Sequence, residues 1–302
     1  MSIESLDGKI MQKDILAVAG ISRQAYHAYF KRSVTTTQRD TEIVTRVVEA
    51  RSLLAYRKMG ARPLYYALKI EGVGINKFEQ LLSTNGFNVS VRKNPRITTD
   101  GSRWINDVNL VRGLNITDIN QVILGDITYW GFKGKFYYVF TLKDAYSKRI
   151  VGLYGSDTLE AKNAIKCLSQ VICLRGKTVL KDCIHHSDAG SQYKSKSYRA
   201  KAKYLRWSIA ANCLENGMAE QLNFILKNHY LEDEEVKTVT QLNGLLRKIK
   251  KIMNEKRPVK FLGYKTPTGF EEFIKGIPTE QRPKFKFSEW GEPIGEGDFG
   301  EA

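Results

Sequence analysis

The sequence is poor in cysteine and proline and has no long apolar run. Its 302 residues contain seven prolines and four cysteines, with no Cys-x-x-Cys pair. Such scattered thiols give no indication of a disulfide framework or a zinc knuckle. The longest uncharged apolar run near the start, residues 15–21, is too short to span a membrane or to serve as a secretory signal. We therefore expect a reduced, cytoplasmic protein without membrane contact.

Acidic residues are scarce in the middle of the chain. The sequence has 48 Lys and Arg against 32 Asp and Glu, a net charge of +16, and the whole excess falls between residues 51 and 206. A segment this basic attracts a polyanion through the release of counterions, although a solubilising surface would also be basic. Aromatic residues lie among these charges, which favours nucleic acid as the partner. A DNA-bound protein would be associated with the nucleoid.

The N-terminal part has the outline of a helix-turn-helix. Residues 12–32 predict a short apolar helix, a break at Gly20, an N-cap at Ser22 and a second helix that ends in basic residues. Any two-helix hairpin would give a similar pattern. In the DNA-binding interpretation, Arg23 and Gln24 at the start of the second helix would contact DNA.

The remaining pattern divides the chain into four parts. Apolar residues at helical spacing over about 41–56, followed by two short helices, complete a helical region over residues 1–87. Residues 88–120 have little apolar periodicity and are typical of a linker. Residues 121–275 predict three consecutive strands, a helix, and then short strands that alternate with helices, which indicates a mixed α/β domain. Residues 276–302 form a C-terminal tail, and its last sixteen residues carry five acidic residues and no basic one, so we expect that end to be solvated.

Three acidic residues of the α/β part are candidates for chemistry. Asp126 falls inside an apolar strand, where a carboxylate is costly without a partner. Asp188 ends another apolar strand, and Glu220 begins a helix away from its apolar stripe. Asn223 and Lys227, three and seven residues later, share the helix face of Glu220. Taken singly, each acid could instead cap a turn or lie at a solvated helix start.

Three carboxylates brought to one point would suit a divalent cation. Like charges held close raise one another's pKa, and a cation relieves the repulsion. Ligand sets made only of oxygen select Mg²⁺ or Mn²⁺. Two such ions are an apparatus for in-line attack on a phosphodiester.

Five sequence motifs of this region resemble a known family. In chain order they are DITYW, DAYSKRIVG, HSDAGSQY, ENGMAEQLNFILK and RPVKFLGYKTP. They resemble the catalytic subunit of bacterial insertion-sequence transposases, which is encoded by the second of two reading frames and has a retroviral-integrase-type (DDE) core. The resemblance is close over residues 121–273. It implies a ribonuclease H-like α/β catalytic core preceded by the helical region, and an activity that cleaves DNA strands at the ends of a mobile element and transfers them to new DNA.

The resemblance also implies roles for particular residues and partners. Asp126, Asp188 and Glu220 take the places of the ligands of two Mg²⁺ or Mn²⁺ ions. Lys227 matches a basic residue that contacts DNA ends, and we expect Asn223 and His186 beside it at the DNA. The implied partners are the element's terminal repeats, target DNA, a protein from the first reading frame, and further copies of this chain.

One departure from the family leaves alternatives open. Only 31 residues separate Asp188 from Glu220, whereas the family usually has about thirty-five, and the shortening falls near residues 204–212. A shortened copy that no longer binds metal would be a DNA-binding protein without catalysis. A structure-specific nuclease on the same fold would cleave DNA without joining it.

Overall fold

The computed structural model describes residues 11–89, 108–188, 190–210, 217–287 and 293–294. The chain forms two compact units. The first comprises residues 1–52 and 70–88, and the second comprises residues 53–69 and 89–302. Residues 53–69 thus belong to the same unit as the α/β part, although the sequence pattern groups them with the N-terminal helices. Within the described residues, no helix is both long and apolar enough to cross a membrane.

The first unit is built from three helices, α1 (Gln12–Val18), α2 (Arg23–Ser52) and α4 (Ile75–Thr84). The predicted break at Gly20 and the cap at Ser22 are confirmed: Gly20 has a φ of 65°, and Ser22 Oγ accepts a hydrogen bond from the amide of Ala25.

The separate helix expected to begin near residue 41 is wrong, because α2 runs unbroken for 30 residues. The segment between residues 33 and 45 contains no Gly or Pro to end the helix. Its threonine hydroxyls donate to backbone carbonyls four residues earlier, as Thr35, Thr37 and Thr41 show. These bonds satisfy the hydroxyls inside the helix, so the β-branched run does not interrupt it.

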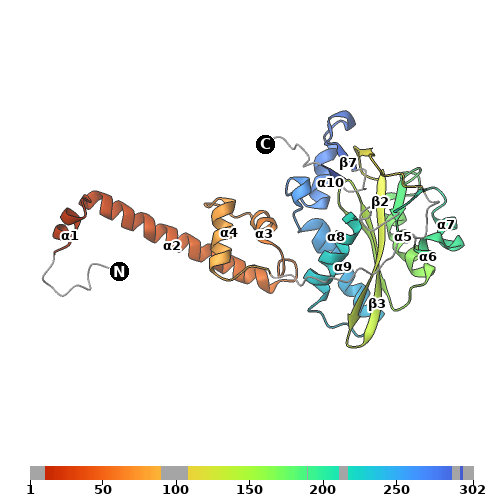
Figure 1. The fold of residues 1–302 in the computed structure, drawn as a ribbon, viewed down its shortest axis with the longest axis horizontal. Helices are drawn as coiled ribbons and strands as arrows, with labels where there is room; N and C mark the ends of the chain where they lie inside the picture. Colours follow the sequence, from red (N-terminus) through yellow and green to blue (C-terminus); the bar gives the residue numbers. More distant parts are fainter. Residues whose placement is uncertain (1–10, 90–107, 189, 211–216, 288–292, 295–302) are drawn as a thin grey trace. The chain divides into compact units, whose positions relative to one another are not determined.

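A five-stranded mixed sheet forms the centre of the second unit (Figure 1). The strands β2 (Val122–Phe132), β3 (Lys135–Asp144) and β4 (Ile150–Ser156) form an antiparallel meander, as the sequence predicts. β5 (Ile184–Ser187) then pairs parallel to β2, and β6 (Arg206–Ile209) pairs parallel to β5. The order across the sheet is β4-β3-β2-β5-β6.

Helices cover both faces of this sheet (Figure 1). One face packs against α5 (Ala161–Arg175), with the short α6 (Ser191–Lys194) and α7 (Lys196–Lys201) beside it. The other packs against α8 (Gly217–Ile225), its π-helical continuation η3 (Leu226–Leu231) and α9 (Val239–Glu255). α10 (Pro267–Lys275) packs against α9. The mixed α/β fold is therefore confirmed.

The supposed linker and tail contribute to a small second sheet. β1 (Asn115–Ile116) pairs with β7 (Phe285–Phe287), which pairs with β8 (Pro293–Ile294). Phe287, expected to begin a solvated tail, is only 1% exposed because Phe285 and Phe287 alternate with Lys286 and point into the core. All five acidic residues that follow lie outside the described residues, which after Phe287 include only Pro293 and Ile294 of β8.

Residues 53–69 join the second unit through charge and ring contacts. This segment includes α3 (Ala61–Ala67). Arg57 forms an ion pair with Glu234 at 3.0 Å, and Tyr66 stacks on Tyr264 with ring centroids 4.0 Å apart. These contacts explain why the segment belongs to this unit.

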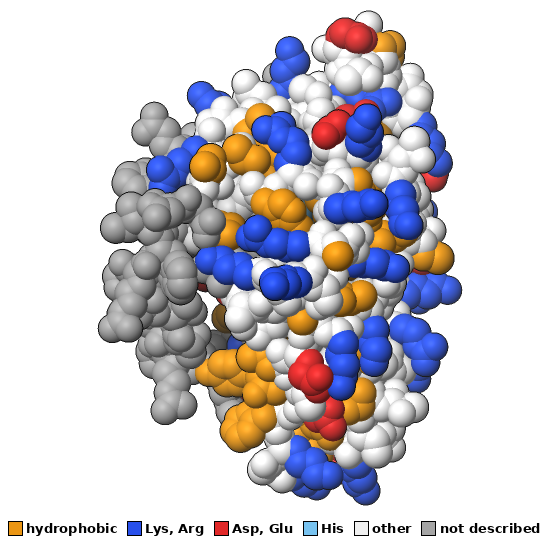
Figure 2. Space-filling model, turned by 90° about the vertical axis from the view of Figure 1, so that its right-hand side faces the viewer, with side chains coloured by type: hydrophobic (Ala, Val, Ile, Leu, Met, Phe, Trp, Pro, Cys, Tyr) orange, Lys and Arg blue, Asp and Glu red, His pale blue; other side chains and the backbone are white. Residues whose placement is uncertain are grey.

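One face of the second unit is strongly basic. Figure 2 shows this face, on the side where α7 lies in Figure 1, with many Lys and Arg side chains and few acidic ones. The charge excess of the sequence is thus partly gathered on one surface.

Candidate active site

Asp126 lies in the middle of the central strand β2 and faces a polar, partly enclosed environment. Its Oδ1 accepts a hydrogen bond from the amide of Ile127 at 2.8 Å, and its Oδ2 accepts one from Asn223 Nδ2 at 2.6 Å. Opposite it on β3, the hydroxyl of Thr141 donates to the Asp126 carbonyl oxygen. Both carboxylate oxygens are therefore oriented, one by the strand and one by helix α8.

The parallel pairing of β2 with β5 brings Asp188 next to Asp126. Gly125 is in register with Ser187, so the two aspartates occupy the next position on neighbouring strands. Asp188 Oδ1 accepts a hydrogen bond from the amide of Gly190, which turns the chain away from the strand. Burial raises the pKa of Asp188, while this hydrogen bond and the charge of Lys194 lower it in part.

Glu220 approaches the two aspartates from the first turn of α8. This helix packs on β2, and Asn223, one turn after Glu220, is the residue that bonds Asp126. Glu220 is the most exposed of the three acids, and partial burial raises its pKa.

The negative charges of Asp188 and Glu220 both act on Asp126. The pKa of Asp126 is raised from 3.8 to about 7, first by burial, then by the negative charge of Asp188 and more weakly by that of Glu220. The hydrogen bonds from Ile127 and Asn223 lower it in part. The charge of Glu220 thus reaches Asp126 despite the short interval that precedes Glu220. Among the described residues, however, no three His, Cys, Asp or Glu side chains are already gathered closely enough to hold an ion.

Comparisons with known proteins agree with this arrangement. Residues 117–213 match the family model of the integrase core domain. A putative transposase of insertion sequence IS986/IS6110 from Mycobacterium tuberculosis is 28% identical over 227 residues, which cover 70% of this chain and 80% of the relative. The transposase of IS904 from Lactococcus lactis is 30% identical over 160 residues, or 51% of this chain and 62% of the relative. The chain therefore carries a match to the integrase core domain and is similar to insertion-sequence transposases.

Further similarities extend over more of the transposase or concern solved structures. An insertion element IS600 protein of 31 kDa from Shigella sonnei is 25% identical over 84% of this chain and 96% of its own length. The catalytic core domain of HTLV-2 integrase in complex with magnesium gives a TM-score of 0.41 at 19% identity, covering 54% of this chain and 99% of that one. The similarity to transposases and the match to the integrase core domain support a polynucleotidyl transferase activity and do not favour the interpretation as a decayed DNA-binding protein.

Lys227 lies beside an exposed aromatic ring that was not among the residues expected at the site. Its Nζ is 5.4 Å from the centre of the Tyr129 ring, and Tyr129 is 43% exposed. Burial lowers the pKa of Lys227, while the charge of Asp126 raises it. Tyr129 falls inside the DITYW motif, three residues after Asp126, and its exposure on an otherwise apolar strand is the feature that marks it.

Two of the expected DNA contacts are buried. Asn223 is 5% exposed and bonds Asp126, so in this structure it positions a carboxylate and does not present its amide to solvent. His186 is fully buried, and its Nδ1 lies 2.8 Å from Ser208 Oγ on β6. A buried ring on a central strand cannot reach DNA without a rearrangement of the sheet. Arg23 and Gln24, in contrast, are exposed in the first turn of α2, and their contact with DNA stays a prediction.

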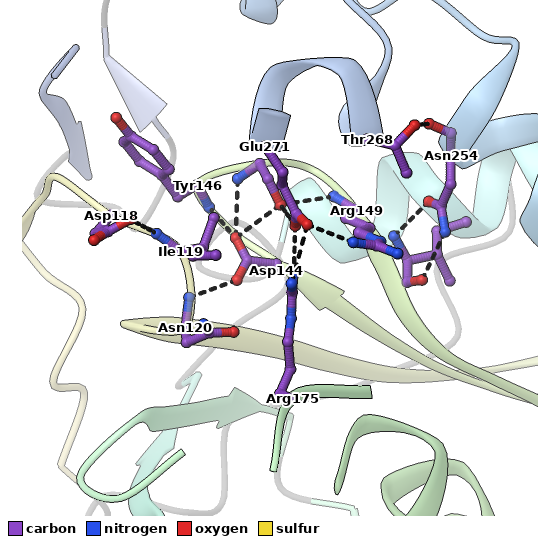
Figure 3. A network of polar contacts seen from close by, with 12 residues as sticks. Asp118, Ile119, Asn120, Asp144, Tyr146, Arg149, Arg175, Asn254, Thr268 and Glu271 are labelled. Carbon is purple, nitrogen blue, oxygen red and sulfur yellow. Dashed lines mark hydrogen bonds and ion pairs between the residues drawn. The ribbon is translucent and has the colours of Figure 1, made fainter. Parts of the chain in front are cut away.

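A fourth buried carboxylate, Asp144 of the DAYSKRIVG motif, belongs to a structural network (Figure 3). It is fully buried and accepts hydrogen bonds from the amides of Asn120, Tyr146 and Ser147. Next to it Glu271 of α10 accepts hydrogen bonds from Arg149 and Arg175, the last residue of α5. The network fastens α5 and α10 to the turn between β3 and β4.

Proposed function

We propose that this transposase cleaves and joins DNA strands by metal-dependent chemistry at Asp126, Asp188 and Glu220. The observation that carries the proposal is the position of Asp126 and Asp188 side by side on the parallel strands β2 and β5, with Glu220 in the first turn of helix α8, which packs on β2. Carboxylates that raise one another's pKa cost free energy, and such a cost is typical of a site where a cation or a substrate compensates it.

The donor set suits two Mg²⁺ or Mn²⁺ ions. All three side chains offer oxygen only, which hard divalent cations prefer, and the more exposed Glu220 leaves access from solvent. Bound ions would activate the attacking oxygen and stabilise the leaving oxygen of a phosphodiester. The three carboxylates would hold the ions, with a small movement bringing their oxygens together.

Other side chains of the site would orient the acids and the DNA. Asn223 holds the Oδ2 of Asp126 by a hydrogen bond of 2.6 Å, which fixes the carboxylate plane. Lys227 lies one helical turn after Asn223 and places a positive charge beside the exposed ring of Tyr129. A phosphate near the reacting end would pair with Lys227, while Tyr129 would stack on the adjoining base or sugar.

The same proposal includes the partners of the reaction. A mobile element has two ends, and each catalytic site acts on one strand at a time. We therefore propose that copies of this chain assemble on the element's terminal repeats, together with the protein of the first reading frame, at the nucleoid.

A strand-joining assay tests this function. The purified protein is incubated with labelled, pre-cleaved duplexes of the DNA that flanks its gene, with Mg²⁺, with Mn²⁺ or with EDTA, and with or without the first-reading-frame protein. We expect joined products only with metal, and a loss of at least about 10³-fold on Asp188→Asn. Cleavage without joining would indicate a nuclease, and DNA binding without either reaction would contradict the proposal.

A further inference from the structure

Between the end of α5 and the first residue of β6, the second unit carries a group of seven exposed cations. We call it the basic patch, and it consists of Lys177, Lys181, Lys196, Arg199, Lys201, Lys203 and Arg206. The segments that carry these residues are joined by backbone hydrogen bonds: Asp182 donates to the Tyr204 carbonyl, and Arg206 donates to the Cys183 carbonyl. The patch belongs to the basic side of the molecule seen in Figure 2.

The charge of this patch is not compensated by the protein. Among the described residues, none of its seven side chains forms an ion pair with a carboxylate. Between residues 176 and 206 the sequence has two acidic residues, Asp182 and Asp188, and Asp188 belongs to the active site. Elsewhere the second unit does pair its surface cations, as Lys58 with Glu232 and Lys162 with Glu160 illustrate. An uncompensated group of cations has a strong affinity for a polyanion.

Strand β5 separates one end of the patch from the carboxylates. Lys181 and Arg206 lie at the beginnings of β5 and β6, whereas Asp188 follows the opposite end of β5. A strand of four residues spans roughly 13 Å. The patch also offers an aromatic surface, because the guanidinium of Arg199 lies 5.4 Å from the centre of the Trp207 ring.

We propose that the basic patch binds the backbone of a second DNA duplex, distinct from the duplex whose end lies at the carboxylates. This inference rests on the proposed function, in which one DNA end is joined to another DNA. Lys227 and Tyr129 stand next to the carboxylates and suit the reacting end. The patch, which begins at the far ends of these strands, suits the DNA to which the reacting end is joined. Its exposed lysines suit phosphate contacts without sequence preference.

The test compares two variants that lose the same charge from different surfaces. One carries Lys177→Gln, Lys181→Gln, Lys201→Gln and Lys203→Gln in the patch. The control carries Arg247→Gln, Lys248→Gln, Lys251→Gln and Lys256→Gln, all exposed and on or next to α9. Circular dichroism verifies that both variants fold as the wild type does.

The first readout is the binding of a covalently closed DNA circle, which has no ends, at several salt concentrations. Each lost phosphate contact lowers the slope of log K against log salt by about 0.9. We expect a loss of about 2–3.6 in the slope for the patch variant and less than about 1 for the control. Equal losses in both variants, or none in the patch variant, would overturn the proposal.

The second readout separates this inference from the proposed function. In the joining assay, we expect the patch variant to need about ten times more target DNA for half-maximal rate at an unchanged requirement for the end duplex. A raised requirement for the end duplex alone would show that the patch holds the reacting DNA, and the proposal would be wrong. If the wild type joins no DNA, the proposed function fails, while the binding of closed circles still decides whether the patch holds duplex DNA.

Discussion

Asp126 and Asp144 are both buried aspartates of the same sheet, and their neighbours assign them different roles. Asp144 is satisfied by three backbone amides and a serine hydroxyl, so its charge is neutralised by the fold itself. Asp126 has one backbone amide and the amide of Asn223, and it faces two further carboxylates. The sequence indicates the importance of Asp126 through its motif, but both residues lie in apolar strands, and only the hydrogen-bond partners distinguish them.

Replacement of Asn223 by alanine should impair catalysis. The change removes the hydrogen bond to Asp126 Oδ2 and leaves the carboxylate free to rotate. Loss of such a supporting partner typically reduces metal affinity or activity by about 10–100-fold, and we expect a decrease of this size in the rate of strand joining. Asn228→Ala is the matched control, since Asn228 on the following turn bonds only the carbonyl of Phe224. Equal rates for the two variants would show that Asn223 does not position Asp126.

Glu271 should make the stability of the fold depend on acid pH. Burial raises the pKa of Glu271, but the hydrogen bonds and charge of Arg175, with further bonds from Ser147 and Arg149, outweigh it and lower the pKa below 4.5. An acid whose pKa is lowered by folding stabilises the folded state above its unfolded pKa, and this stabilisation is lost as the pH falls through the folded pKa.

The variant Glu271→Gln measures this contribution. At pH 7 it should lower the free energy of unfolding by about 3 kcal/mol, because Arg175 stays buried without its carboxylate. As the pH falls below the ordinary glutamate pKa of 4.5, the difference from the wild type should narrow, since the wild-type glutamate is then becoming protonated. Urea unfolding at pH 7 and at acid pH measures both free energies. A difference between the variant and the wild type that is independent of pH would show that the Glu271 carboxylate does not have this role.

At the scale of elements, the sequence predicts strands and helices well where their patterns are strong. The meander of β2, β3 and β4 and the helices α5 and α9 follow directly from alternating or helical apolar spacing. α2 and β7 were mispredicted for physical reasons: threonine hydroxyls bonded within a helix do not end it, and the alternation of Phe285 and Phe287 is too short to predict a strand.

The two glycines of β4 set the distance between the sheet and its helices. A Cβ atom at Gly152 would lie 2.8 Å from the Cys167 carbonyl oxygen of α5, and one at Gly155 would lie 2.4 Å from a Leu242 methyl of α9. The glycines point to opposite faces, so each lets one helix approach closely.

Gly152→Ala should therefore destabilise the second unit. The new methyl group meets backbone, which cannot rotate away, and we expect a loss of about 1–3 kcal/mol in the free energy of unfolding. Gly244→Ala in α9 is the control, because open space surrounds Gly244 and alanine should stabilise the helix by about 0.5–1 kcal/mol. If Gly152→Ala unfolds at the same denaturant concentration as the wild type, the close approach of α5 does not require glycine at this position.

At the scale of the whole molecule, the sequence identifies the order of parts and the catalytic region. The motifs locate three acids that lie 94 positions apart from first to last, and the parallel pairing of β2 and β5 explains how two of them meet. The extent of the catalytic unit was harder to predict, because residues 53–69 and 285–287 join it through contacts with distant segments. Pairings between positions so far apart along the chain leave no periodic signal in the sequence.

The binding of Mn²⁺ tests the central claim most directly. Electron paramagnetic resonance during a titration with Mn²⁺ counts the ions bound to the purified chain with its DNA end. We predict two ions for the wild type and a loss of at least one for Asp188→Asn and for Glu220→Gln, with no loss for the exposed control Glu272→Gln. If Asp188→Asn and Glu220→Gln bind as many Mn²⁺ ions as the wild type and the control do, the result would contradict a metal site at these carboxylates.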